Sequence, residues 1–128
     1  MPEAQGSVIV VSGVAANRAR LGDGLQAAGI AHETLASFDA LLPRLAAEQP
    51  PVAALVLDAH PAEAVYPLIN RLEGEARGIA LPVLLLTDNL ADASRRFYSD
   101  LLHGVEVLAK PVADADWLAR VHALLALA

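Results

Sequence analysis

Three polar side chains stand where predicted buried strands end: Asp58, Thr87 and Lys110. Asp58 follows the apolar run 52–57, and Thr87 follows the run 82–86. Runs of small, β-branched and aliphatic residues are typical of strands buried on both faces of a parallel sheet. Ligands of open α/β sheets bind beyond the carboxyl ends of the strands, and neighbouring strands lie about 4.8 Å apart. We therefore expect the carboxylate, the hydroxyl and the amine to meet at one edge, where they could act on a phosphate or a carboxylate.

Each of these residues alone has an ordinary explanation. Thr87 by itself is typical of a turn hydroxyl, and a lysine is usually a solvated surface residue. Lys110 is, however, the only lysine of the chain, and it lies directly before Pro111 at the predicted edge. The three residues together are better evidence for a functional site than any one of them alone.

The rest of the chain alternates strand and helix patterns that would position this edge. Strand patterns cover the segments 7–12, 32–36, 52–58, 81–86 and 105–109. Helix patterns lie between and after them, near 18–28, 41–45, 66–73, 92–103 and 114–127. Such alternation implies right-handed crossovers and helices on both faces of the sheet. The sequence therefore predicts a three-layer α/β sandwich with five parallel strands and five helices.

Capping residues and apolar stripes define the helices further. Gly29 is expected to close the first helix, and Ser37 or Asp39 to cap the second. The expected buried faces of the first, second and last helices are Leu21, Leu25 and Ala28; Leu41, Leu42 and Leu45; and Trp117, Val121, Leu124 and Leu125. These stripes follow the spacing of an amphipathic helix.

Composition excludes several classes of function. A chain of 128 residues suits one domain, and its mean hydropathy of +0.45 comes from apolar runs too short to cross a bilayer. The net charge of −6 argues against nucleic-acid binding, which requires clustered Lys and Arg. There is no cysteine, the four histidines lack metal-ligand spacing, and the amino terminus lacks a secretory signal. We expect a cytoplasmic protein that contacts neither nucleic acid nor membrane.

The order of these residues resembles the receiver domain of bacterial response regulators, over residues 8 to about 127. The residues that carry the resemblance are Asp58 at a strand end, Pro82 to Thr87, Gly104 to Pro111, Gly29-Ile30 and Pro51. The resemblance implies a flavodoxin-like fold with strand order 2-1-3-4-5. It further implies Asp58 as phosphoacceptor, Thr87 as switch hydroxyl and Lys110 as phosphoryl contact.

Two positions depart from the receiver pattern. Receivers carry a pair of acidic residues at the end of the first strand, where this chain has Ser12 and Gly13. Mg²⁺ binds through carboxylates and water, and it supplies much of the charge neutralisation in phosphoryl transfer. Three residues before Lys110, receivers usually carry the aromatic residue that reports phosphorylation, and this chain has Val107. We expect no metal, no other cofactor, and slow or absent phosphorylation.

Three further residues flank the predicted site. Asp88 could replace a lost cation ligand, although an exposed loop carboxylate is the simpler interpretation. His60 and Asn89 lie where receivers tune the lifetime of the phosphoryl group. The loop from Asp58 to Pro61 is one residue shorter than usual, so a solvated histidine is the simpler interpretation for His60.

The preferred hypothesis is a pseudo-receiver, a protein-interaction module in which Asp58 and Lys110 form an ion pair without phosphate. A protein partner, a fused output domain or a second copy of the chain would bind the fourth helix, fifth strand and fifth helix. The apolar residues expected to contribute to that face are Phe97, Tyr98, Leu101, Leu102 and Trp117. The chain is expected to be the amino-terminal module of a longer protein.

Two alternatives remain open from the sequence. The first is a working receiver that takes phosphate on Asp58 from a histidine kinase, with Mg²⁺ bound through Asp88 or water. The second is a nucleotide-binding enzyme that uses the turn at Gly13, but this turn has only one of the glycines of the G-x-G-x-x-G fingerprint. The hypothesis of an interaction module predicts no enzymatic activity.

Overall fold

The fold is described by a computed structural model over residues 6–47, 51–59, 82–87 and 105–127. The predicted helices near 66–73 and 92–103 lie outside these residues, as do His60, Asp88, Asn89 and the apolar residues predicted on the fourth helix. Within the described segments, no helix is long and apolar enough to cross a membrane.

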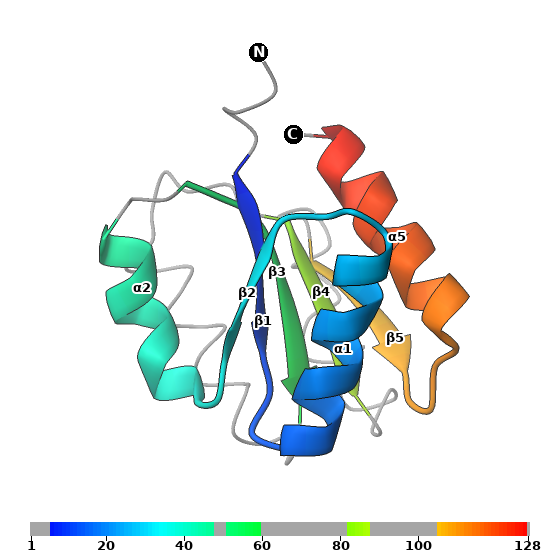
Figure 1. The fold of residues 1–128 in the computed structure, drawn as a ribbon, viewed down its shortest axis with the longest axis horizontal. Helices are drawn as coiled ribbons and strands as arrows, with labels where there is room; N and C mark the ends of the chain where they lie inside the picture. Colours follow the sequence, from blue (N-terminus) through cyan, green and yellow to red (C-terminus); the bar gives the residue numbers. More distant parts are fainter. Residues whose placement is uncertain (1–5, 48–50, 60–81, 88–104, 128) are drawn as a thin grey trace.

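Five parallel strands form one sheet in the order β2-β1-β3-β4-β5, as predicted. The strands are β1 (Ser7–Val11), β2 (His32–Leu35), β3 (Val52–Ala59), β4 (Val83–Thr87) and β5 (Val105–Ala109). The helices are α1 (Ala15–Ala27), α2 (Leu41–Ala47) and α5 (Asp114–Leu127), and a short 3₁₀ turn, η2 (Phe38–Ala40), precedes α2. Helices α1 and α5 lie on one side of the sheet and α2 on the other, which gives the three layers (Figure 1).

The register of the sheet brings the ends of three strands together. Asp58 of β3 pairs with Leu86 of β4, and Thr87 pairs with Ala109 of β5. The backbone N–H of Lys110 donates to the carbonyl of Thr87 at 2.7 Å. The carboxyl ends of β3, β4 and β5 therefore lie side by side, which is the edge that the sequence predicts as the site.

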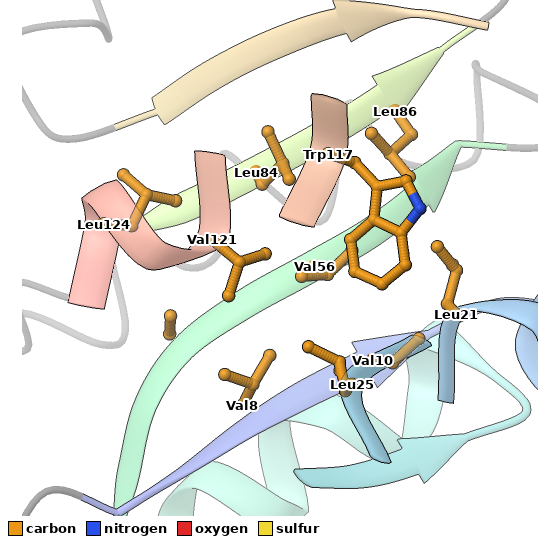
Figure 2. Close-up of a cluster of buried hydrophobic side chains, with 11 residues drawn as sticks. Val8, Val10, Leu21, Leu25, Val56, Leu84, Leu86, Trp117, Val121 and Leu124 are labelled. Carbon is orange, nitrogen blue, oxygen red and sulfur yellow. The ribbon is translucent and has the colours of Figure 1, made fainter. Parts of the chain in front are cut away.

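The core between the sheet and the helices α1 and α5 is built from alternate residues of the strands. Because side chains alternate between the faces of a strand, only every second residue points to these helices. The buried cluster on this face comprises Val8, Val10, Ala54, Val56, Leu84 and Leu86 from the strands, Leu21 and Leu25 from α1, and Trp117, Val121 and Leu124 from α5 (Figure 2). The intervening strand residues, such as Ile9 and Leu55, are buried toward the other face.

Helix α1 ends in a Schellman motif, which confirms the role predicted for Gly29. Gly29 has φ = 73°, a left-handed conformation that glycine adopts without steric cost. Its N–H donates to Gln26, and the N–H of Ile30 donates to Leu25. Ala28 is the exposed C-cap, so its predicted place in the buried stripe is wrong.

The side chain of Ser37 accepts a hydrogen bond from the N–H of Asp39 at 3.0 Å, at the start of η2. Of the two residues predicted as caps, Ser37 is therefore the one whose side chain binds a backbone N–H. Leu41 and Leu45 of α2 are buried as predicted. An ion pair from Arg44 to Glu33, with a bond of 2.6 Å, ties α2 to β2 and lowers the pKa of Glu33.

Trp117 is fully buried, and its ring lies over β3, between Leu21 of α1 and Leu86 of β4 (Figure 2). Its burial confirms its place in the predicted buried stripe of the last helix, and it therefore adds nothing to an exposed partner surface. The ring lies against Gly24 of α1, where any side chain would lack room: a Cβ on Gly24 would lie 2.8 Å from Cζ2 of Trp117. Gly24 thus sets how closely α1 approaches the ring.

We predict that Gly24→Ala destabilises the fold by about 1–2 kcal/mol. The free-energy cost of overpacking against the rigid ring exceeds the stabilisation that the higher helix propensity of alanine provides. Gly22→Ala is the matched control, since its Cβ would meet Thr34 at an ordinary 3.4 Å. That variant should be neutral or up to about 1 kcal/mol more stable. Urea unfolding measures both, and equal stability of the two variants would contradict the packing described.

Candidate functional site

Asp58 lies at the carboxyl end of the central strand with only 1% of its surface exposed. Strands β1 and β4 flank β3 on either side, so the carboxylate is enclosed by protein in the plane of the sheet. Thr87, at the end of β4, is also fully buried. A buried carboxylate is costly unless donors or charges compensate it, and the site is built around this requirement.

Three side chains, one just after β1, one on α1 and one just after β5, donate to the Asp58 carboxylate. Lys110 Nζ donates to Oδ1 at 2.5 Å, which confirms the predicted ion pair. Ser12 Oγ donates to Oδ2 at 2.7 Å, and Asn17 Nδ2 donates to the same oxygen at 3.0 Å. Both carboxylate oxygens are therefore hydrogen-bonded within the protein.

The turn between β1 and α1 positions two of these donors. The Oγ of Ser12 accepts the N–H of Val14 at 3.2 Å, and its carbonyl accepts Arg18 Nη1 at 2.9 Å. The single proton of the Ser12 hydroxyl has two acceptors within reach, the Val14 carbonyl at 3.2 Å and Asp58 Oδ2 at 2.7 Å, of which the carboxylate is the nearer. Asn17 lies in the first turn of α1, from which its amide reaches the same oxygen.

The balance of these interactions favours the charged carboxylate. Burial of Asp58 raises its pKa, but hydrogen bonds from Lys110, Ser12 and Asn17 and the charge of Lys110 together outweigh it. The net effect lowers the pKa of Asp58 below its ordinary value. Asp58 is therefore an anion throughout the physiological pH range, already neutralised by an internal cation.

A cavity of about 340 Å³ opens beside the ion pair. Its lining comes from α1, from the ends of β3 and β4 and from the segment after β5, and consists of Asn17, Arg20, Leu21, Asp58, Leu86, Lys110, Pro111 and Val112. The arrangement can hold a small group at the strand ends, next to the exposed part of the Lys110 side chain.

Solved structures with the same architecture include several signalling proteins. A response regulator receiver protein from Burkholderia phymatum is 29% identical, with a TM-score of 0.72, over 96% of this chain and 97% of that one. The fold is that of a response regulator receiver domain. A sensor protein from Polaromonas sp. JS666 has a TM-score of 0.78 at 20% identity, over 94% of this chain and 96% of that one. A chemotaxis response regulator of Vibrio cholerae has a TM-score of 0.75 at 19% identity, covering 94% and 98% of the two chains.

No protein-family model and no curated protein matches the sequence. The relationship to receiver domains is therefore carried by the three-dimensional fold, over nearly the whole chain. It confirms the flavodoxin-like architecture that the sequence resemblance implied.

The described residues of this receiver-like domain do not fit the magnesium site that the fold implies. Ser12 and Gly13 contribute no carboxylate, and both oxygens of Asp58 face hydrogen-bond donors. Within the described part of the chain, no group of three His, Cys, Asp or Glu side chains could hold a metal ion. Mg²⁺ prefers oxygen ligands in octahedral geometry, whereas an amine and an amide N–H repel it.

The structure brings together Asp58, Thr87, Lys110 and Ser12, as the sequence analysis predicted, and Gly13 follows on the exposed turn. It adds Asn17, to which the sequence analysis assigned no role. An amide in the first turn of the helix, after a strand that lacks its acidic residues, makes Asn17 a candidate, but the sequence does not fix the direction of its side chain. Ser12 likewise proves to be a donor and not merely a position where an acid is missing.

Lys110→Met should destabilise the fold by about 3 kcal/mol, since it leaves a buried carboxylate without its cation. The double variant Asp58→Asn with Lys110→Met should recover much of this loss, because both charges are then absent. Chemical denaturation of the four members of the cycle measures the coupling. Additive effects of the two substitutions would show that the ion pair contributes nothing.

The lowered pKa of Asp58 also predicts an acid dependence of stability. An unfolded Asp titrates near about 3.9, so the stabilisation from Asp58 is complete above that pH and is lost as pH falls through the lower folded pKa. Below about pH 4, the unfolding free energy of the wild type should therefore decline more steeply than that of Asp58→Asn. Urea unfolding across the acid range down to about pH 2 tests this expectation, and parallel curves would contradict it.

Proposed function

We propose that this chain is a receiver-like regulatory module that acts without metal-dependent phosphorylation of Asp58 and works by binding a protein partner. The observation that supports the proposal best is the set of three donors on the Asp58 carboxylate. They occupy the oxygen atoms that would otherwise attack a phosphoryl donor or bind a cation. On this proposal the domain is a signalling module and not an enzyme.

The chemistry of phosphoryl transfer explains why this arrangement is unfavourable for it. Transfer depends on positioning and on neutralising the charge of the transferred group. Here Lys110 is already paired with Asp58, and Ser12 and Asn17 hold the other oxygen. A phosphoryl group would have to displace these contacts without the metal that supplies much of the neutralisation.

The proposed partner surface includes β5 and the outer side of α5. β5 is an edge strand of the sheet, and α5 exposes Arg120, His122 and Ala123 among other residues. Arg120 also pairs with Glu106 of β5 at 3.0 Å across this face. The bound protein would be a fused output domain, a separate partner or a second copy of the chain. The fourth helix, predicted as part of this surface, lies outside the described residues.

One observation favours a second candidate, a receiver that is phosphorylated on Asp58 by a histidine kinase. Asp58, Thr87 and Lys110 all lie at the same edge of the sheet, in the order that the receiver pattern requires. Mg²⁺ would then bind through Asp88 or water. The measured Mg²⁺ affinity separates this candidate from the preferred one.

The test is incubation of the protein with Mg²⁺ and a small acyl phosphate, followed by measurement of acid-labile phosphate on the intact protein. We expect no stoichiometric labelling of the wild type, because no group of three acidic, histidine or cysteine side chains among the described residues could hold the metal. Labelling of the wild type that disappears in Asp58→Ala would contradict the proposal and support the second candidate.

The same labelling test is then applied to the double variant Ser12→Asp with Gly13→Asp, which places an acidic pair at the end of β1. It removes the Ser12 hydrogen bond to Asp58 and adds two carboxylates beside it. We expect this variant to gain Mg²⁺-dependent labelling on Asp58. The control is Ala46→Asp with Ala47→Asp, which adds the same two charges at exposed positions at the end of α2 and should gain no labelling.

A further inference from the structure

The segment that follows Lys110 is held onto α1 by a second set of polar contacts. Arg20 Nε donates to Asp114 Oδ1 at 2.9 Å, and Arg20 Nη2 donates to the carbonyl of Val112. Trp117 Nε1 donates to the same Asp114 oxygen at 3.0 Å. We call these four residues, Arg20, Val112, Asp114 and Trp117, the clasp.

Helix α1 connects the clasp to the Asp58 site. Asn17 and Arg20 are three residues apart on α1 and thus neighbours on its surface. Asn17 binds Asp58, and Arg20 binds the chain two and four residues after Lys110. The side chains of Asn17, Arg20, Asp58 and Lys110 line one cavity, together with Val112. The ion pair and the clasp therefore lie on two sides of the same cavity.

Packing gives the clasp little room to adjust. Trp117 is fully buried against Gly24 of α1, where the ring leaves no space even for a methyl group. Pro111, next to Lys110, restricts the backbone between the ion pair and Val112. A displacement of the Lys110 backbone would therefore change the contacts of Arg20 or the position of Trp117.

We propose that the clasp transmits the state of the Asp58–Lys110 ion pair to the packing of α1 against α5. Breaking the ion pair frees Lys110, shifts Val112 and Asp114, and loosens Trp117 beneath α1. Position 107 carries a valine, so this route does not depend on an aromatic side chain at that position of β5. The transmission involves neither metal nor phosphate. It can therefore fail its test while the proposed function holds, and the proposed function can fail while the transmission holds.

The chain contains a matched control for the clasp. Arg120 of α5 pairs with Glu106 of β5 at 3.0 Å, and its side chain is 54% exposed, comparable to the 46% of Arg20. Both are exposed arginines in ion pairs that involve the α5 region. The Arg120 pair does not bridge to α1, so its loss should leave the transmission intact.

The experiment combines Asp58→Asn with Arg20→Ala or Arg120→Ala and follows the emission of Trp117, the only tryptophan, and hydrogen exchange at its backbone N–H. That N–H donates to Ala113 in the first turn of α5. In the otherwise wild-type chain, Asp58→Asn should speed this exchange roughly fivefold, as the loss of about one hydrogen bond would. It should also shift the emission maximum of the tryptophan.

In the Arg20→Ala background the response to Asp58→Asn should be abolished, and in the Arg120→Ala background it should persist. A response that survives Arg20→Ala unchanged would overturn the inference, as would no response in the otherwise wild-type chain. Ser12→Ala, which removes a single donor from Asp58, repeats the comparison with a milder perturbation if Asp58→Asn lowers stability too far.

Discussion

A charged carboxylate buried at the end of the central strand constrains the rest of this structure. Asp58 is enclosed by the sheet, so its charge must be compensated by side chains that reach it from other elements. Lys110 after β5, Ser12 after β1 and Asn17 on α1 meet this requirement together. Their common contact fixes the end of β5, the turn after β1 and the first turn of α1 relative to one another.

The apolar core supplies the rigidity that this arrangement needs. The alternating residues of the strands and the faces of α1 and α5 close around Trp117, and Gly24 allows the two helices to approach (Figure 2). Because Trp117 also donates to Asp114, the core and the polar clasp share one side chain. The receiver fold is thus combined with a site in which Ser12, Asn17 and Lys110 donate to the Asp58 oxygens. A magnesium site would instead need carboxylates and water around the ion.

Much of this could be predicted from the sequence. Buried strands and their order follow from short apolar runs and from the receiver resemblance, and the parallel sheet then brings Asp58, Thr87 and Lys110 to one edge. Contacts that depend on the phase of a helix could not be predicted, because the sequence does not fix how α1 is rotated at its start. Asn17 was missed for this reason, and Ala28 was misplaced because the helix ends one residue earlier. Trp117 was predicted in a buried stripe and also beside a partner surface, because an apolar residue on an amphipathic helix can cover the core or form a surface, and packing against Gly24 decides for the core.

On this account both oxygens of the Asp58 carboxylate accept hydrogen bonds from the protein itself, and these donors keep Mg²⁺ from binding there. The most direct measurement is the ¹³C NMR signal of the Asp58 side-chain carboxyl, assigned by comparison with Asp58→Asn and followed as Mg²⁺ is added at neutral pH. We predict that the signal stays at its ionised position and does not move with added Mg²⁺. A saturable shift of this signal at millimolar Mg²⁺ would contradict the account.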